Sequence, residues 1–184
     1  SKSPPPNKRT RSKRSKRNSP VSALVITPLP SESLSDFFTS FDFSDESEAL
    51  QAFIALLRET ASHRQNIIHA CYDGETPIGF VSLKMTGDVD NIPGLLIEFL
   101  YIKPEYRRKT IGDSPRRSFA ILDDVIMLAF ELQKIVAINH VFLIPVDENK
   151  RSLYLEYGFE NIPGSGKNPF EDFMVFNLLA EEVV

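Results

Sequence analysis

The chain has 184 residues with 21 basic and 25 acidic side chains, which give a formal net charge of −4. Residues 1–20 hold eight of the basic side chains and no acid, so the rest of the chain carries 13 basic and 25 acidic residues. A body this acidic argues against a nucleic-acid backbone as its ligand, because nucleic acids attract clustered Lys and Arg. It suits a cationic substrate better.

Residues 1–20 contain almost no large apolar side chain and cannot build a core. We therefore expect a disordered basic tail, followed by one domain over residues 21–184 that buries roughly two-thirds of its unfolded surface. The tail could contact nucleic acid or an acidic partner, or it could act only through solubility.

The cysteine content and hydropathy predict a cytoplasmic protein. Cys71 is the only cysteine, so no intrachain disulfide can form. No apolar stretch reaches the roughly 20 residues that span a bilayer, and the N-terminal residues lack the apolar core of a signal peptide. We therefore expect no membrane partner. The three histidines are dispersed without the spacing of metal ligands, so we also expect no metal site.

The first part of the chain contains short apolar runs and one helical pattern. Residues 23–27 form a short run rich in β-branched side chains and bounded by prolines, which indicates an edge strand. Residues 44–62 begin with capping residues and continue with apolar side chains at helical spacing, which predicts an amphipathic helix. Residues 66–72 and 77–85 are extended runs that a tight turn joins into an antiparallel hairpin. We expect residues 87–94 to form a polar loop.

The second part of the chain alternates strands with helices. Residues 95–102 form an apolar strand, and Pro115 then opens a long buried helix. Residues 138–146 are a nearly continuous apolar run, consistent with a strand parallel to residues 95–102 across a right-handed crossover. A short helix over residues 149–157 and a last strand over residues 173–179 follow. This order predicts an α/β fold with a mixed sheet flanked by helices.

The strand over residues 97–102 runs into a basic turn that Gly112 closes before the next helix. Unpaired N–H groups and the positive end of the helix dipole add to the cations of this turn, so the segment is suited to a pyrophosphate. Seven of the 13 basic residues of the body lie here or in one later segment. They are Arg107, Arg108, Lys109, Arg116, Arg117, Lys150 and Arg151.

The later segment, residues 149–159, has a polar start, a short helix with two tyrosines and a terminal Gly158-Phe159. In this order the two segments resemble the GNAT superfamily of acyl-CoA-dependent N-acetyltransferases. The resemblance covers residues 24–179 and implies a single GNAT domain with a mixed, mostly antiparallel sheet. It also implies acetyl-CoA as co-substrate, a primary amine as acceptor, and direct attack of the amine in a ternary complex.

The resemblance also implies roles for named positions. It places the N–H group that polarises the thioester carbonyl near Tyr101 or Ile102, and it makes Tyr154 the acid that protonates the departing thiolate. Asn149 matches a position that bonds the pantetheine arm, although an Asn that opens a helix is also a good cap. Thr110 replaces the middle glycine of the family's loop. The pyrophosphate-binding residues would be Arg107, Arg108, Lys109, Thr110, Ile111 and Gly112.

Glu98 lies inside an apolar strand, an environment suited to proton transfer by a carboxyl group. Alternation along the strand puts Leu96 and Leu100 on the same face as Glu98, which would leave a buried, unpaired acid if that face were the core. We therefore expect Glu98 to face the acceptor cleft as the catalytic base. A chain of waters is the alternative base.

Two other functions are left open by the sequence. Phe41-Asp42-Phe43-Ser44, followed by Leu50, Phe53 and Ile54, resembles a segment of GNAT toxins that acetylate the amino acid on charged tRNA. Phe43 and Ser44 stand where those toxins have Cys and Gly. Thr110 also allows a catalytically inactive GNAT-fold module that senses acyl-CoA or binds a partner. A homodimer is one possibility for the oligomeric state.

Overall fold

The computed structural model describes residues 24–107 and 117–179. Within these ranges the strands form one sheet of seven strands, in the order β1-β2-β3-β4-β5-β7-β6. Only β4 and β5 pair in parallel, and the other neighbours are antiparallel. The predicted α/β fold with a mixed, mostly antiparallel sheet is therefore confirmed. The strands are β1 Leu24–Pro28, β2 Ile67–Asp73, β3 Thr76–Val89, β4 Ile92–Ile102, β5 His140–Leu143, β6 Glu160–Asn161 and β7 Met174–Asn177.

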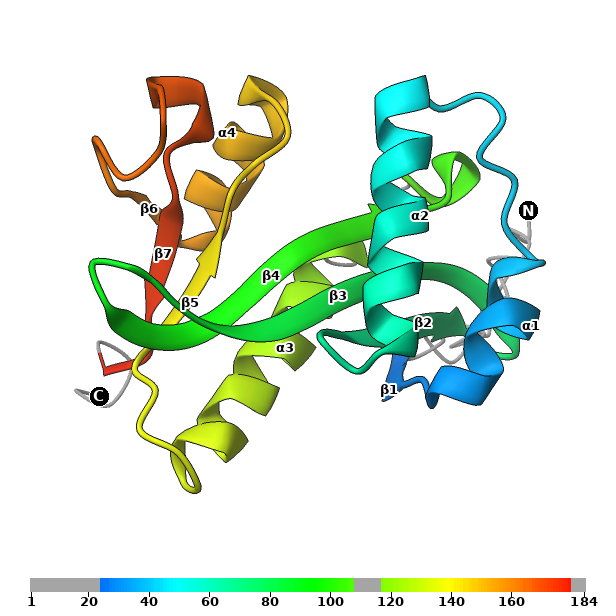
Figure 1. The fold of residues 1–184 in the computed structure, drawn as a ribbon, viewed down its shortest axis with the longest axis horizontal. Helices are drawn as coiled ribbons and strands as arrows, with labels where there is room; N and C mark the ends of the chain where they lie inside the picture. The colour runs from blue at the N-terminus through cyan, green and yellow to red at the C-terminus, as the bar shows by residue number, and fades with distance from the viewer. Residues whose placement is uncertain (1–23, 108–116, 180–184) are drawn as a thin grey trace, which may run out of the picture.

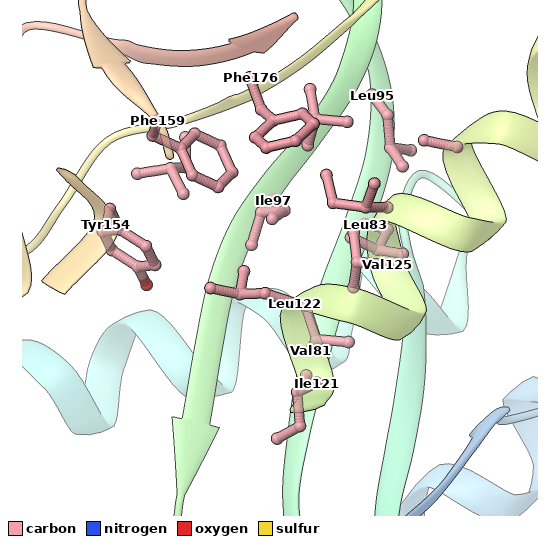
Figure 2. Packing of buried hydrophobic residues seen from close by; sticks show 14 of the residues in the cluster. Val81, Leu83, Leu95, Ile97, Ile121, Leu122, Val125, Tyr154, Phe159 and Phe176 are labelled. Atoms are coloured by element: carbon pink, nitrogen blue, oxygen red, sulfur yellow. The ribbon is translucent and has the colours of Figure 1, made fainter. Parts of the chain in front are cut away.

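Helices cover both faces of this sheet. Figure 1 shows α2 in front of β3 and β4 and α3 behind them. Behind the sheet, α3 packs on an aliphatic core that includes Val81, Leu83 and Ile97, and Figure 2 shows these side chains meeting Ile121, Leu122 and Val125. In front, α1 and α2 pack on an aromatic core. The helices in the described ranges are α1 Leu34–Phe38, α2 Glu48–Ser62, α3 Arg117–Gln133 and α4 Glu148–Tyr157.

The two helices that border the site begin at side-chain caps. Ser47 caps α2 by accepting a hydrogen bond from the Leu50 N–H, so the helix starts inside the predicted range. Asp147 caps α4 by accepting from the Lys150 N–H at 2.8 Å. Asn149 is therefore not the cap of α4, because Asp147 precedes it and already binds the free N–H group.

Residues 87–94 are a hairpin rather than the predicted polar loop. β3 runs to Val89 and β4 starts at Ile92, so only two residues connect the strands. Asp90 and Asn91 both have positive φ, of 51° and 57°. Asp and Asn tolerate this conformation and a two-residue hairpin needs it, so the polar composition reflects the turn and the adjoining strand ends.

A β-bulge lies at Glu98, in the middle of β4. Ser82 of β3 pairs with Phe99, and the next residue, Leu83, pairs with Ile97, so Glu98 is the extra residue. The bulge exchanges the faces of the strand: Ile97 packs on the α3 side, whereas Phe99 packs on the α2 side. Leu100 also packs on the α3 side. The prediction that Leu100 shares a face with Glu98 is wrong, because one inserted residue shifts the alternation by one.

Candidate active site

The edges of β4 and β5 separate just before the bulge. Their parallel pairing ends at Ile97 opposite Leu143, while β4 continues to Ile102. A cleft of about 930 Å³ opens between them, and it is lined by β4, the turn after β4, the residues before α2, the start of α3, and α4. Clefts of this size hold cofactor-sized ligands in proteins.

The open edge of β4 directs backbone N–H groups toward the cleft. The Lys103 N–H donates to the Ile78 carbonyl of β3 at 2.8 Å. Backbone groups alternate along a strand, so the Tyr101 N–H is also directed toward β3, whereas the Leu100 and Ile102 N–H groups are directed toward the side where β5 has ended. Of the two amides that the resemblance proposed, only that of Ile102 therefore faces the cleft.

Arg107, at the start of the basic turn, is bound by acceptors of the protein. Its Nε atom donates to the Ile102 carbonyl at 2.7 Å, and its terminal nitrogen forms an ion pair of 2.9 Å with Glu46. The guanidinium group also lies over the Tyr101 ring, 5.1 Å from the ring centre. The Tyr101 hydroxyl donates to the same Glu46 oxygen at 3.1 Å. Burial, and then the nearby Glu46 carboxylate, raise the pKa of Tyr101 to about 12.

The Glu98 carboxylate has bonding partners within the protein. It is therefore not the buried, unpaired acid that a core position would have produced. Its Oε1 atom lies 2.9 Å from Lys84 Nζ, and its Oε2 atom accepts a hydrogen bond of 2.9 Å from the Ser82 hydroxyl. Glu98 also lines a small cavity of about 30 Å³, and Tyr154 and Lys150 of α4 line the same cavity. The fold thus brings the predicted base and the predicted acid to one place.

Tyr154 is buried in α4, and its hydroxyl has no hydrogen bond to any described residue. Its ring packs edge-on against Phe159, 5.8 Å between ring centres. Figure 2 shows the hydroxyl directed away from Phe159. Tyr154 lines both cavities. Burial, and then the charge of Asp147, raise the pKa of Tyr154 to about 12, so the phenol keeps its proton at neutral pH.

The family model described as the acetyltransferase (GNAT) family matches residues 31–159. This match covers well over half of the chain. The chain belongs to the GNAT acetyltransferase family. Acetyl-CoA is the acyl donor of this family. No curated protein sequence matches this GNAT chain at a significant level.

Solved structures similar to this GNAT chain include several acetyltransferase toxins. AtaTR bound with AcCoA has a TM-score of 0.66 and 20% identity, over 88% of this chain and 97% of that one. AtaT complexed with acetyl-methionyl-tRNAfMet has a TM-score of 0.63 and 19% identity, over 87% and 98% of the two chains. A tyrosine-to-phenylalanine mutant of KacT has a TM-score of 0.61 and 15% identity, over 87% and 98%. These likenesses establish a shared fold.

Not all of the described basic residues that were predicted to surround one anion line the cleft. Arg107, Arg117 and Lys150 line the cleft. Arg151 does not: it is buried on the other side of α4, where it donates to the Asn161 side chain and to the carbonyls of residues 170 and 172. Arg108, Lys109, Thr110, Ile111, Gly112 and Arg116 lie outside the described residues, as does the basic tail.

The described lining fits an acyl-CoA. It combines cationic side chains for a phosphate, open backbone N–H groups at Leu100 and Ile102 for a carbonyl, and apolar side chains such as Leu153 for an aliphatic arm. Asn149 lines this cleft as well. No helix in the described part of the chain is both long and apolar enough to cross a membrane.

No sequence motif marks Glu46, Ser82 or Lys84 as a site residue. Glu46 precedes α2, and its position is explained by the preference for acidic residues near the start of a helix. Ser82 and Lys84 read as polar residues of an alternating strand. Only the pairing of β3 with β4 brings Ser82 and Lys84 to Glu98, and only the position of the residues before α2 brings Glu46 to the cleft.

Proposed function

We propose that this GNAT chain transfers the acetyl group of acetyl-CoA to a primary amine by direct attack in a ternary complex. The observation that carries this proposal is the shared cavity of Glu98 and Tyr154, at the point where β4 and β5 separate. A proton acceptor and a proton donor beside one opening are what acetyl transfer to an amine requires.

Each step has a residue of this chain to perform it. When bound, acetyl-CoA supplies the activated acetyl group. The Ile102 N–H donates a hydrogen bond to the acetyl carbonyl oxygen as negative charge develops there. Glu98 accepts the proton that the attacking amine loses, and Tyr154 donates its hydroxyl proton to the departing sulfur. Arg107, Arg117 and Lys150 bind the phosphates of the donor, together with residues 108–112, and Asn149 bonds the pantetheine arm.

The small cavity has room for one water molecule. Its volume of about 30 Å³ equals the share of one water molecule in the liquid. The cavity is lined by Glu98, Tyr154 and Lys150, which give such a molecule polar partners. We therefore infer that the proton reaches Glu98 through one water rather than by direct contact.

The test is a screen of amine acceptors, from polyamines and amino acids to peptides, in which thiol release from acetyl-CoA is measured. Tyr154→Phe removes the proposed acid and should lower kcat on the best acceptor by about a hundredfold, with little change in KM for acetyl-CoA. Tyr157→Phe is the matched control, because the Tyr157 hydroxyl donates to Asp123 of α3 at 2.8 Å. Full activity of Tyr154→Phe would remove the acid assignment.

Aminoacyl-tRNA is the second candidate acceptor. The resemblance of residues 41–54 to a GNAT-toxin segment supports it, and so does the shared fold with AtaT, which has been solved in complex with acetyl-methionyl-tRNAfMet. The eight basic residues of residues 1–20 would supply RNA affinity to an otherwise acidic chain. Deletion of residues 1–20 should then abolish acetylation of charged tRNA and spare small amines.

A catalytically inactive module is the third candidate, and calorimetry with acetyl-CoA separates it from the enzymes. Binding without turnover on any amine would indicate an acyl-CoA sensor. Absence of binding would leave only an interaction module, because both enzymatic functions need the donor.

A further inference from the structure

Three hydrogen-bonded side chains, those of Asn66, Ser82 and Glu98, form a line that connects α2 with strands β3 and β4. Asn66, which precedes β2, donates from Nδ2 to the Leu57 carbonyl of α2 at 3.3 Å and to the Ser82 hydroxyl at 2.6 Å. Ser82 of β3 then donates to Glu98 Oε2 at 2.9 Å. Asn66 is 3% exposed and Ser82 is fully buried. The line therefore lies inside the protein and ends at Glu98, which lines the small cavity.

The direction of the hydrogen bonds in this line follows from the groups themselves. The Leu57 carbonyl can only accept, so the Asn66 amide must present its NH₂ group to that carbonyl and to Ser82. A serine hydroxyl has one proton, and with Asn66 donating to its oxygen that proton is directed to Glu98. Asn66 thus orients Ser82, and Ser82 orients the carboxylate.

Asn66 is held in this place at a cost in stability. Its Oδ1 atom is buried and has no hydrogen-bond partner among the described residues. A buried acceptor without a partner destabilises the folded state. An apolar side chain would fill the same space without an unpaired acceptor. The Asn66 side chain is therefore explained by the two hydrogen bonds that its NH₂ group donates.

Lys84 holds the other carboxylate oxygen of Glu98. Its Nζ atom lies 2.9 Å from Oε1, and Lys84 is more exposed than Glu98. The β-bulge allows this arrangement, because it leaves Glu98 unpaired with β3 while Ser82 and Lys84 of β3 stay beside it. Lys84 from β3 forms an ion pair with the carboxylate, and Lys150 and Tyr154 from α4 are the other charged or titratable residues that line the small cavity in the described structure.

We propose that Asn66, Ser82 and Lys84 are positioning residues that fix the Glu98 carboxylate toward the acceptor amine. This role rests on the proposed acetyltransferase function, in which Glu98 is the base. One hydrogen bond to each carboxylate oxygen fixes the plane of the group and still leaves lone pairs for the proton that the amine gives up.

The test compares Ser82→Ala and Lys84→Met with the unaltered protein on the best amine found in the screen. A carboxylate that loses one of its two donors is no longer fixed in one plane, so kcat on the amine should fall in both variants, and Lys84→Arg, which keeps a donor at that position, should restore it. We expect kcat/KM for the amine to fall about tenfold at neutral pH, with acetyl-CoA binding unchanged by calorimetry.

Thr60→Ala is the matched control for loss of a hydroxyl, because Thr60 donates only to carbonyls of its own helix, those of Leu56 and Leu57. Lys84 is 39% exposed, so Lys84→Met tests the proposal even if the buried Ser82 does not tolerate substitution. An active protein whose Ser82→Ala and Lys84→Met variants keep the original kcat/KM for the amine would overturn the positioning role alone. A protein that acetylates no amine would overturn the proposed function, and the positioning role with it.

Discussion

Arg107 and Glu46 are 61 positions apart in the chain, and their side chains form an ion pair of 2.9 Å in the cleft. Because Arg107 also donates to the Ile102 carbonyl, the pair ties the end of β4 to the residues before α2. The residue predicted to bind the pyrophosphate is thus held by a carboxylate of the protein. A phosphate must compete with Glu46 for the same guanidinium group.

This competition predicts that Glu46→Gln binds CoA more tightly, by about threefold, because an ion pair this exposed contributes less than about 1 kcal/mol. Arg107→Gln should weaken CoA binding instead. Isothermal titration calorimetry measures both, with Glu48→Gln as a control that removes a neighbouring exposed charge in the first turn of α2. If Arg107→Gln binds CoA like the unaltered protein, Arg107 has only a structural role.

The adjacent residues Lys150 and Arg151 should respond in opposite ways to substitution by Met. Arg151→Met leaves the Asn161 side chain and two carbonyls without their donor, so the free energy of unfolding should fall by about 3 kcal/mol. Lys150→Met should leave stability within about 0.5 kcal/mol and weaken CoA binding. Urea denaturation and calorimetry measure the two effects. Equal loss of CoA affinity in both variants would contradict the orientation of Arg151.

Gly79→Ala should destabilise the protein by about 2–3 kcal/mol, because the new methyl group would meet the backbone carbonyl of Tyr101 on β4. That backbone cannot move aside without displacing the Ile102 amide, so acetyl-CoA binding should weaken as well. Gly87→Ala is the control on the same strand, since a methyl group there meets no atom. Urea denaturation of both variants decides the matter, and equal stabilities would show that β4 is not packed as described.

Stability should fall as the pH rises from about 10 to about 12, in part through Tyr154. Its pKa is raised from the usual 10 to about 12 in the folded protein, so the folded state holds the phenol proton more tightly than the unfolded chain does. Stabilisation of this kind is complete below pH 10 and is lost as the pH approaches 12. Urea midpoints measured across this interval should decline less steeply for Tyr154→Phe. Parallel curves for the two proteins would show that Tyr154 is not buried in its neutral form.

Much of the candidate site follows from local sequence. The order of a strand, a basic turn and a later helix that ends in Gly158-Phe159 identified the family, and Tyr154 lies where that order placed it, on the wall of the cleft. The apolar spacing of Leu50, Phe53, Ile54 and Leu57 likewise predicted an amphipathic helix, and Ile54 and Leu57 are buried in α2 whereas Phe53 is 37% exposed. Such features depend on residues a few positions apart, so the linear chain displays them.

The sequence by itself determined the fold class, the family and the helix that carries Tyr154, because side-chain periodicity, capping and turn preferences act over a few residues. Only the tertiary structure decided that Glu98 is a bulge residue held by Ser82 and Lys84, that Glu46 binds Arg107, and that Arg151 faces away from the cleft. A bulge exists only relative to a partner strand, and an ion pair between distant residues exists only once the sheet has brought them together. Strand register and helix orientation are set by packing of the whole core, which no short segment of the chain contains.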